Sequence, residues 1–323
     1  MRRALFVAER GRGTTSPNPI VGAVVVSPAD IVVGQGAHRF AGGPHAEVAA
    51  LDAAGPAARG ATLYCTLEPC SHTGRTGPCC ERVVAAGISR VVIATGDPNP
   101  EVNGRGIAYL REHGVSVEMA GAEDERIARR QNAAFFSWIG SHRPHVTLKT
   151  AVSRDGFAGY EDRPAKLTGA RMDRLMHRQR AEVDAIAVGS STILIDDPLL
   201  TSRLVFRERP LVRVIFDRRE RVTEGARVFG TVDHGPVIVT GDAIPSELAK
   251  LGEQGILSLL VEGGPSLHRA FWDAGAVDRV QIVETPAVLG RGIRAFCPVA
   301  PADAERRRIG DDLLIEWDVH RTH

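Results

Sequence analysis

A histidine, a glutamate and two cysteines between residues 45 and 79 have the residue types and spacing of a metal site. His45 precedes Glu47 by two positions, and Cys70 and Cys79 follow, with Cys70 directly after a Glu-Pro pair. A catalytic zinc ion is held by three protein ligands, keeps one position open for water and needs a nearby base that is not a ligand. His45, Cys70 and Cys79 can supply the ligands, and Glu47 can be the base. We therefore predict a catalytic zinc site in this stretch.

The order of these residues is that of zinc-dependent nucleobase deaminases, in which His-x-Glu is followed by Pro-Cys and a second cysteine. Glu47 would take a proton from water, pass it to a ring nitrogen and help ammonia to leave. The loop between the two cysteines is longer than in most such enzymes, and it contains His72 and Arg75. Both side chains could contact polar groups or a phosphate of the substrate, or they could lie on a solvated loop.

Other interpretations of the cysteine-rich stretch remain open. Cys80 or His72 could act as a fourth ligand, which would make the zinc structural and the protein a non-enzymatic binding module. A disulfide within the stretch would suit a secreted protein, although no signal peptide precedes it. A structural zinc would leave Glu47 without a role, so we favour the catalytic site.

Helix and strand ends can bring the three ligands together. His45 opens residues 45–55, a run of helix formers. Residues 61–67 predict a buried strand that a proline ends, so Cys70 falls just beyond it. Pro78 is a good first residue for a second helix, which would place Cys79 in its first turn.

Length and element pattern predict two domains of the α/β class. The chain has 323 residues, about twice the length of a typical domain. Predicted strands alternate with helices, which favours layered sheets covered by helices. A polar, proline-containing segment ends at residue 143, and a fresh strand follows it. We place the boundary there and expect domains at 1–143 and 144–323.

Charge and hydropathy exclude several partners. The 40 Lys and Arg residues against 39 Asp and Glu residues give a net charge of +1, which provides no field for nucleic acid. The apolar runs are too short to span a membrane. The N-terminus predicts an amphipathic helix instead of a signal sequence, so we expect a cytoplasmic protein. Cys65 and Cys297 fit small apolar residues of the core.

Asn18 lies between two prolines, which fix an extended turn around it. Its amide can both donate and accept hydrogen bonds, which suits the edge of a pyrimidine ring. A turn-forming asparagine without a ligand is the alternative.

Further motifs surround the metal site and continue into the second half of the chain. They are Pro17-Asn18-Pro19, TLEPCSHTGRTGPCC (66–80), GDPNPEVNGRG (96–106), Lys149 with Asp155-Gly156, Asp196-Asp197-Pro198 and VEGGP (261–265). With these motifs the chain resembles the bifunctional deaminase-reductases of riboflavin biosynthesis, nearly from end to end. The resemblance implies a cytidine-deaminase-like three-layer domain followed by a dihydrofolate-reductase-like domain. It also implies zinc, NADPH and a small-molecule substrate, a diaminopyrimidinone that carries a phosphoribosylamino group. The first domain would replace an amine by oxygen, the second would reduce the ribose to ribitol, and the enzyme would be a homo-oligomer.

The resemblance also implies roles for residues of the second domain. Lys149 would be a proton donor. The substrate would be bound by Arg180, Leu200, Arg203 and Glu262, and the cofactor by Val152, Lys166, Thr192, Asp196, Arg218, Gly264, Pro265, Ser266 and Leu267.

Several positions depart from the family pattern, two of them among the predicted cofactor contacts. Lys166 stands where the family usually has tryptophan, and Arg218 stands where it often has serine. Arg218 could instead bind the 2′-phosphate of NADPH. The alternative is an active deaminase joined to a degenerate domain that does not reduce. Ammonia release without NADPH oxidation would identify that alternative.

Overall fold

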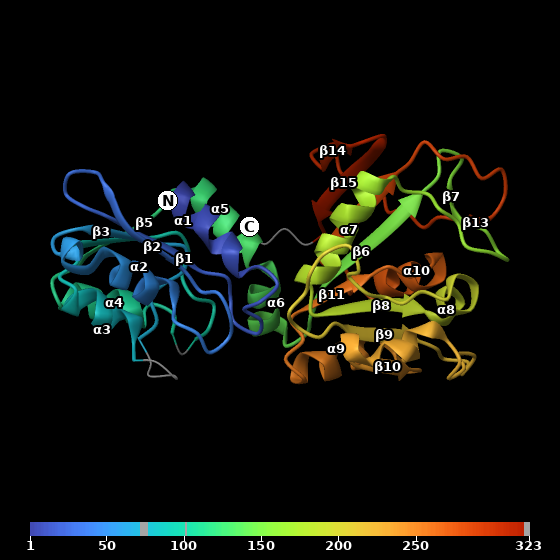
Figure 1. Cartoon of the computed structure of the whole chain (residues 1–323), viewed down its shortest axis with the longest axis horizontal. Coiled ribbons are helices and arrows are strands. Elements are labelled where there is room, and N and C mark those ends of the chain that lie inside the picture. Colours follow the sequence, from blue (N-terminus) through green and yellow to red (C-terminus); the bar gives the residue numbers. More distant parts are fainter. Residues whose placement is uncertain (72–76, 101, 320–323) are drawn as a thin grey trace. The chain divides into compact units, whose positions relative to one another are not determined.

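The computed structural model describes residues 1–71, 77–100 and 102–319, and it separates between Ser141 and His142 into two compact units. Figure 1 shows each unit as a sheet with helices packed on it. His72 and Arg75, the predicted substrate contacts of the long loop, lie outside the described residues.

The first unit is built on a five-stranded sheet with the order β2-β1-β3-β4-β5. The hairpin of β1 and β2 is antiparallel, whereas β3, β4 and β5 run parallel. Helices α2, α3 and α4 contribute to the main core on the sheet, and α1 and α5 pack together in a second, smaller cluster. The element bounds are α1 Arg2–Ala8, β1 Gly22–Val26, β2 Val32–Ala37, α2 Ala46–Ala54, β3 Thr62–Cys65, α3 Cys79–Ala85, β4 Arg90–Ile93, α4 Arg105–Glu112, β5 Ser116–Met119, α5 Ala122–Gln131 and α6 Ala133–Ser141.

The second unit is built on an eight-stranded sheet with the order β10-β9-β8-β11-β6-β12-β15-β14. Its strands are parallel up to β12, and β15 and β14 complete it in antiparallel pairing. Helix α7 packs on one face through Met172 and Met176, and α9 and α10 contribute to the core of the other face. The bounds are β6 His145–Val152, β7 Phe157–Gly159, α7 Ala170–Glu182, β8 Ala185–Gly189, α8 Ser190–Asp196, β9 Val212–Phe216, β10 Val237–Thr240, α9 Ile244–Glu253, β11 Ser258–Val261, α10 Pro265–Asp273, β12 Arg279–Glu284, β13 Ile293–Arg294, β14 Glu305–Ile309 and β15 Asp312–Asp318.

A close contact between α2 and β2 fixes the position of the metal-site helix. A Cβ atom on Gly36 would lie 2.4 Å from the carbonyl oxygen of Ala46, so only glycine permits this approach. Because Ala46 begins α2, the glycine sets where His45 and Glu47 lie relative to the sheet.

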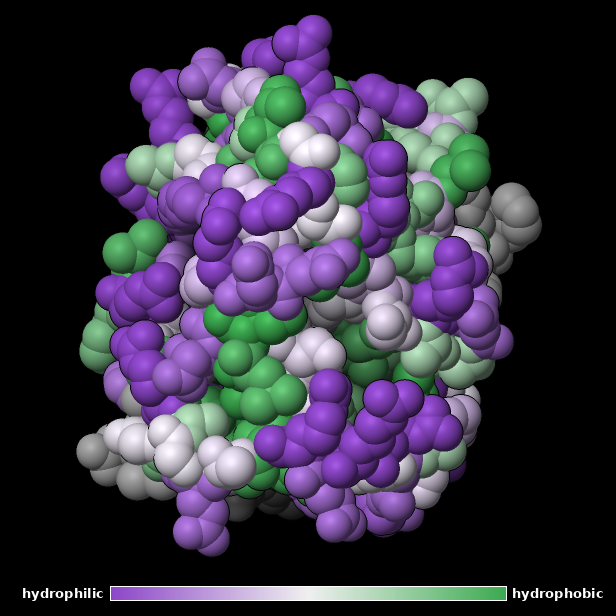
Figure 2. Space-filling model, turned by 90° about the vertical axis from the view of Figure 1, so that its right-hand side faces the viewer, coloured by the Kyte–Doolittle hydropathy of each residue, from purple (hydrophilic) through white to green (hydrophobic). Residues whose placement is uncertain are grey.

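The α/β class and its two-part architecture are confirmed, whereas one prediction about the core is wrong. Cys65 is fully buried, but Cys297 is exposed, because it lies in the irregular segment between β13 and β14 and not on a strand. Among the described helices, none is both long and apolar enough to cross a bilayer. On the side of the second unit seen in Figure 2, apolar and polar groups are interspersed.

Candidate functional site

The structure brings the three predicted zinc ligands together from three different elements. His45 is the N-cap of α2, Cys70 follows β3, and Cys79 is the first residue of α3. Their ligand atoms all lie within 4.8 Å of one another. The imidazole Nδ1 of His45 lies 3.1 Å from the Sγ of Cys79 and 3.5 Å from the Sγ of Cys70.

This arrangement fits a tetrahedral zinc ion. Zn–S bonds of about 2.3 Å and Zn–N bonds of about 2.0 Å separate nitrogen and sulfur ligands by about 3.5 Å. The two nitrogen–sulfur distances lie near that value, and one imidazole with two thiols is a donor set that zinc prefers. Cys79 also donates its backbone N–H to the Sγ of Cys70, at 3.4 Å. Hydrogen bonds from Cys79 and His45 lower the pKa of Cys70 to about 4, so this sulfur is a ready thiolate.

Cys80 does not join the ligand cluster. Its side chain is 1% exposed and belongs to the core with Val83 and Leu110. Among the described residues, the cluster that could hold a metal contains His45, Cys70 and Cys79 without a fourth member.

Glu47 lies beside the cluster in the first turn of α2. Its side chain is 3% exposed and lines the same cavity as His45 and Cys70. Burial raises the pKa of Glu47 to about 7, so the carboxyl group can both accept and donate a proton near neutral pH.

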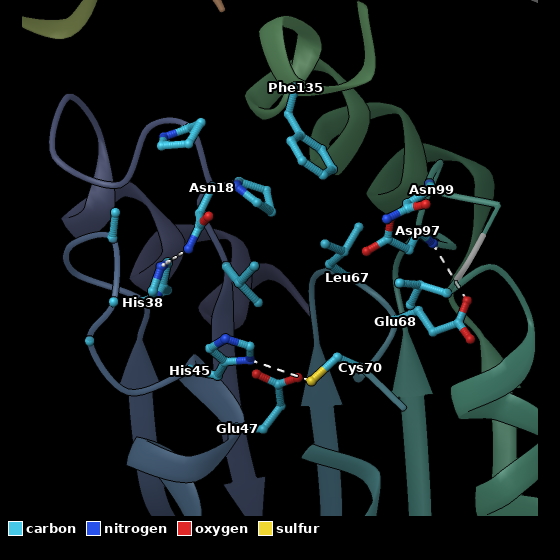
Figure 3. A pocket seen from close by; sticks show the side chains of 17 residues that line it. Asn18, His38, His45, Glu47, Leu67, Glu68, Cys70, Asp97, Asn99 and Phe135 are labelled. Atoms are coloured by element: carbon cyan, nitrogen blue, oxygen red, sulfur yellow. Dashed lines mark hydrogen bonds between the residues drawn. The ribbon is translucent and has the colours of Figure 1, made fainter. Parts of the chain in front are cut away.

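A cavity of about 450 Å³ opens next to these residues, as Figure 3 shows. Asn18 and His38 lie on one side of it, and Asp97 and Asn99 lie on the other. Phe135 points into the cavity from α6. Its size and mixed lining suit a small polar ligand with one flat ring.

His38 determines how the amide of Asn18 is oriented. The Nδ1 of His38 lies 3.0 Å from the carbonyl oxygen of Pro44, which can only accept, so Nδ1 carries the proton. Burial lowers the pKa of His38, and its neutral ring therefore offers Nε2 as an acceptor. Asn18 donates its amide N–H to Nε2 at 3.1 Å. The carbonyl oxygen of Asn18 is consequently left to accept from a ligand.

Glu68 is a site residue that the sequence interpretation missed. Its carboxylate is 3% exposed and accepts backbone N–H groups of Gly104, Gly106 and Ile107 at 3.0, 3.0 and 3.2 Å. These groups belong to the start of α4, where a negative charge is favourable. Glu68 also lines the cavity and lies beside the loop that carries Asp97. In the sequence, only its position in the Glu-Pro-Cys motif indicated that Glu68 belongs to the site.

Asn132 connects two walls of the cavity. It accepts the backbone N–H of Ile20 at 2.8 Å and donates to the carbonyl oxygen of the same residue at 2.9 Å. Ile20 follows the Pro-Asn-Pro segment, and Asn132 precedes α6, which carries Phe135. The two walls are therefore held in a fixed relation.

In the second unit, the structure brings Lys149, Arg180 and Glu262 together. Arg180 extends from α7 and donates from Nε to a carboxylate oxygen of Glu262 at 3.0 Å, and its Nη2 forms an ion pair with the same oxygen. Arg180 also donates to the carbonyl oxygen of Thr201 at 3.3 Å, next to Leu200. Burial lowers the pKa of Lys149, and the negative charge of Glu262 opposes this shift. A lysine in such surroundings can give up a proton more readily than one in water.

Five of the predicted cofactor residues lie at the starts of two helices. Thr192 is on α8, and Gly264, Pro265, Ser266 and Leu267 open α10. The two helix starts are neighbours, because Gly189 before α8 and Gly263 before α10 both lie against Leu267. Arg221, which the sequence interpretation missed, donates to the hydroxyls of Ser190 and Ser191 at 2.7 and 3.1 Å at the start of α8.

The other predicted residues are exposed or half-buried, and Arg203 lies close enough to His177 of α7 to lower its pKa. Lys166 is exposed and forms an ion pair with Asp173 of α7. Asp196 and Arg203 are exposed at the end of α8 and in the following segment, Arg218 is exposed after β9, and Val152 is half-buried at the end of β6.

Comparisons with known proteins agree with this geometry. The zinc-binding region of cytidine and deoxycytidylate deaminases matches residues 1–95, and the RibD C-terminal domain matches residues 144–311. The riboflavin biosynthesis protein RibD of Aquifex aeolicus is 40% identical over 315 residues, which cover 91% of this chain and 88% of that protein. The Escherichia coli protein of the same name is 37% identical, with 98% and 97% of the two chains covered.

Solved structures of similar proteins match nearly the whole chain. A diaminohydroxyphosphoribosylaminopyrimidine deaminase/5-amino-6-(5-phosphoribosylamino)uracil reductase of Thermotoga maritima is similar with a TM-score of 0.87 and 33% identity, over 98% of this chain and 96% of that one. RibD of Acinetobacter baumannii is similar with a TM-score of 0.85 and 32% identity, over the same shares of the chains.

Proposed function

Because this chain belongs to the RibD family of bifunctional deaminase-reductases in riboflavin biosynthesis, we propose which of its residues carry each of the two reactions. The observation that carries the assignment is the cluster of one imidazole and two thiols with the buried carboxyl of Glu47 beside it. Zinc and NADPH are the cofactors of the two activities.

We assign the deaminase reaction to His45, Cys70 and Cys79 as zinc ligands and Glu47 as the proton carrier. The zinc ion supplies a Lewis acid that makes water reactive at neutral pH. Glu47 takes one proton from that water and delivers it to the ring nitrogen while the water oxygen bonds to the carbon that bears the amine. Glu47 then transfers the second proton to the amine, and the carbon–nitrogen bond breaks to release ammonia.

The substrate that we propose is a diaminopyrimidinone with a phosphoribosylamino group, as the name of the Thermotoga maritima protein indicates for that enzyme. Asn18 supports this choice, because His38 leaves its carbonyl oxygen free to accept a hydrogen bond from an amino group of the ring. Phe135 can cover a ring face from α6. His72 and Arg75 remain proposed contacts of the ribosyl phosphate.

We assign the reductase reaction to the pocket around Lys149. NADPH supplies the hydride for the carbon that joins the ribose to the amine. Lys149 gives a proton to the ribose ring oxygen as its bond to that carbon breaks, which leaves an open ribitol chain. Arg180, Leu200, Arg203 and Glu262 are the proposed substrate contacts of this pocket. The proposed cofactor contacts are Val152, Lys166, Thr192, Asp196, Arg218, Gly264, Pro265, Ser266 and Leu267.

Two further expectations concern the state of the protein in the cell. The five cysteines are free, as is usual in a reducing compartment, which supports a cytoplasmic location. We also propose a homo-oligomer from the family resemblance, and light scattering of the purified protein measures its mass.

The experiment that tests the deaminase assignment compares Glu47→Gln with the exposed control Glu81→Gln. Glu47→Gln should keep the zinc content of the wild type and lose at least about 100-fold in ammonia release, because general acid–base catalysis contributes about that much or more. NADPH oxidation with pre-deaminated substrate should remain unchanged in both variants. Unchanged ammonia release by Glu47→Gln would remove Glu47 from the mechanism.

A further inference from the structure

Gln281 is a buried polar side chain beside Lys149, and the assignments above give it no role. It lies on β12, which pairs in parallel with β6, and its register partner on β6 is Lys149. Its side chain is 2% exposed. Register partners on neighbouring strands lie about 4.8 Å apart and point to the same side of the sheet. The two side chains are therefore direct neighbours.

The packing of β12 shows which side of the sheet they share. Val280 and Ile282 belong to the core on the face of α9 and α10. Val283 packs with Met172 and Met176 of α7 on the opposite face. Because side chains alternate along a strand, Gln281 and Lys149 face α7, where Arg180 is also located.

The amide of Gln281 is held in one orientation by a carboxylate. Its Nε2 donates to Oε1 of Glu316 on β15 at 2.7 Å, and Glu316 lies 3.7 Å from the guanidinium of Arg307. A carboxylate can only accept, so the nitrogen of the amide faces Glu316 and the oxygen faces away from it. That oxygen is buried and has no hydrogen-bond partner among the described residues.

Lys149 has the donors that this oxygen lacks. Its ammonium group carries three N–H donors and forms no hydrogen bond that involves another described residue. The Oε1 of Glu262, in the segment that follows β11, is likewise buried and unpartnered within the described part of the chain. β11 and β12 lie on the two sides of β6. The unpartnered oxygens of Glu262 and Gln281 therefore lie on opposite sides of the ammonium group of Lys149.

We propose that Gln281 is a positioning residue of the reductase, whose side-chain oxygen accepts a hydrogen bond from the ammonium group of Lys149. Glu262 accepts a second hydrogen bond from the opposite side. With two N–H groups fixed in this way, the third points out of the sheet toward the substrate. The proposal rests on the role assigned above to Lys149.

Five titratable groups lie around Lys149 or beside its neighbours. They are Asp173 and Arg180 on α7, Glu262 after β11 and His268 on α10, with His177 of α7 beside the first three. Gln281 adds an uncharged acceptor to this group, so it can fix the lysine without stabilising its charged form as strongly as a carboxylate would.

The test compares Gln281→Leu, the double variant Gln281→Glu/Glu316→Gln and the control Thr147→Val, which removes a hydroxyl from the same face of β6 two residues before Lys149. NADPH oxidation is measured with pre-deaminated substrate across pH, and ammonia release reports on the other unit of the same molecule. Gln281→Leu should lower kcat of reduction about 10-fold or more, since a hydrogen bond to a charged group is lost. The double variant exchanges the two ends of the hydrogen bond between positions 281 and 316 and keeps an acceptor for Lys149, so it should recover part of kcat and move the pH dependence of kcat upward. Thr147→Val should resemble the wild type in both reactions.

The possible results separate this proposal from the assignment of Lys149. If Lys149→Met abolishes reduction but Gln281→Leu reduces at the wild-type rate, Gln281 is not a positioning residue. If Lys149→Met itself reduces normally, the assignment of Lys149 fails. Equal loss of kcat in Gln281→Leu and in the double variant, with no change in pH dependence, would show a merely structural role and overturn the proposal.

Discussion

Replacing Glu68 by glutamine should destabilise the first unit far more than a change of one atom suggests. One carboxylate oxygen of Glu68 accepts the N–H groups of Gly106 and Ile107, and the other accepts that of Gly104. Glutamine has the same shape, but one of its two terminal groups is an NH₂ donor. Whichever way the amide turns, a donor faces backbone donors that have no room to move away, because Gly106 lies tightly against the carbonyl oxygen of Pro69.

The expected magnitude follows from these contacts. A hydrogen bond to a charged group contributes about 1.5–3 kcal/mol, and the variant loses one or two of them while the rest lose their charge assistance. We expect the free energy of unfolding of the first unit to fall by about 3–6 kcal/mol, a large share of the stability of a typical domain. Since Glu68 also lines the cavity and lies beside Asp97, ammonia release should decline as well.

Urea unfolding followed by a probe of the first unit, such as protease resistance of residues 1–141, measures this loss. Glu81→Gln, an exposed change on α3, is the matched control and should stay within about 0.5 kcal/mol of the wild type. NADPH oxidation with pre-deaminated substrate reports on the second unit and should persist. A Glu68→Gln variant as stable as Glu81→Gln would refute the reasoning that this carboxylate holds the start of α4.

Three other perturbations have defined outcomes. His38→Leu removes the acceptor that orients Asn18, so KM for deamination should rise about 5-fold or more, and an unchanged KM would contradict this orientation. Chelation of zinc should abolish ammonia release and leave NADPH oxidation with pre-deaminated substrate intact, and a parallel loss of both activities would contradict separate sites. Asp278→Asn should destabilise the second unit by about 2–4 kcal/mol, because Asp278 binds both terminal nitrogens of Arg143 at 2.7 Å. Burial opposes ionisation of Asp278, but hydrogen bonds from Arg143 hold its pKa below the usual value, so its contribution exists above about pH 4 and is lost on acidification. The stability difference between wild type and Asp278→Asn should therefore shrink below that pH, and a difference that grows there would contradict the ion pair.

The sequence predicts best where chemistry restricts the residue types. His45, Cys70 and Cys79 could be grouped before any fold was known, because few combinations of side chains bind zinc. The strand and helix ends that hold them were also predictable, since proline and glycine mark such ends. Pro78 was expected as the first residue of α3, and the structure makes it the N-cap instead.

Residues whose role depends on distant backbone groups were not predictable. Glu68 contacts a turn more than thirty positions later in the chain, and no local sequence pattern indicates that contact. Gln281 depends on the register between β12 and β6, which a single sequence does not reveal. Cys297 shows the opposite error, because residue type alone suggested burial whereas its irregular segment leaves it exposed.

The two hydrogen bonds between Asn132 and Ile20 determine the shortest piece of this protein that can be expected to deaminate. The recognisable zinc-binding region ends at residue 95, yet the side chain that clamps the Pro-Asn-Pro segment comes from position 132. A fragment trimmed to residue 95 would keep the proposed zinc ligands, but it would lose this clamp together with β5 and α4–α6. Anyone isolating the first activity should therefore cut near Ser141, where the first compact unit ends.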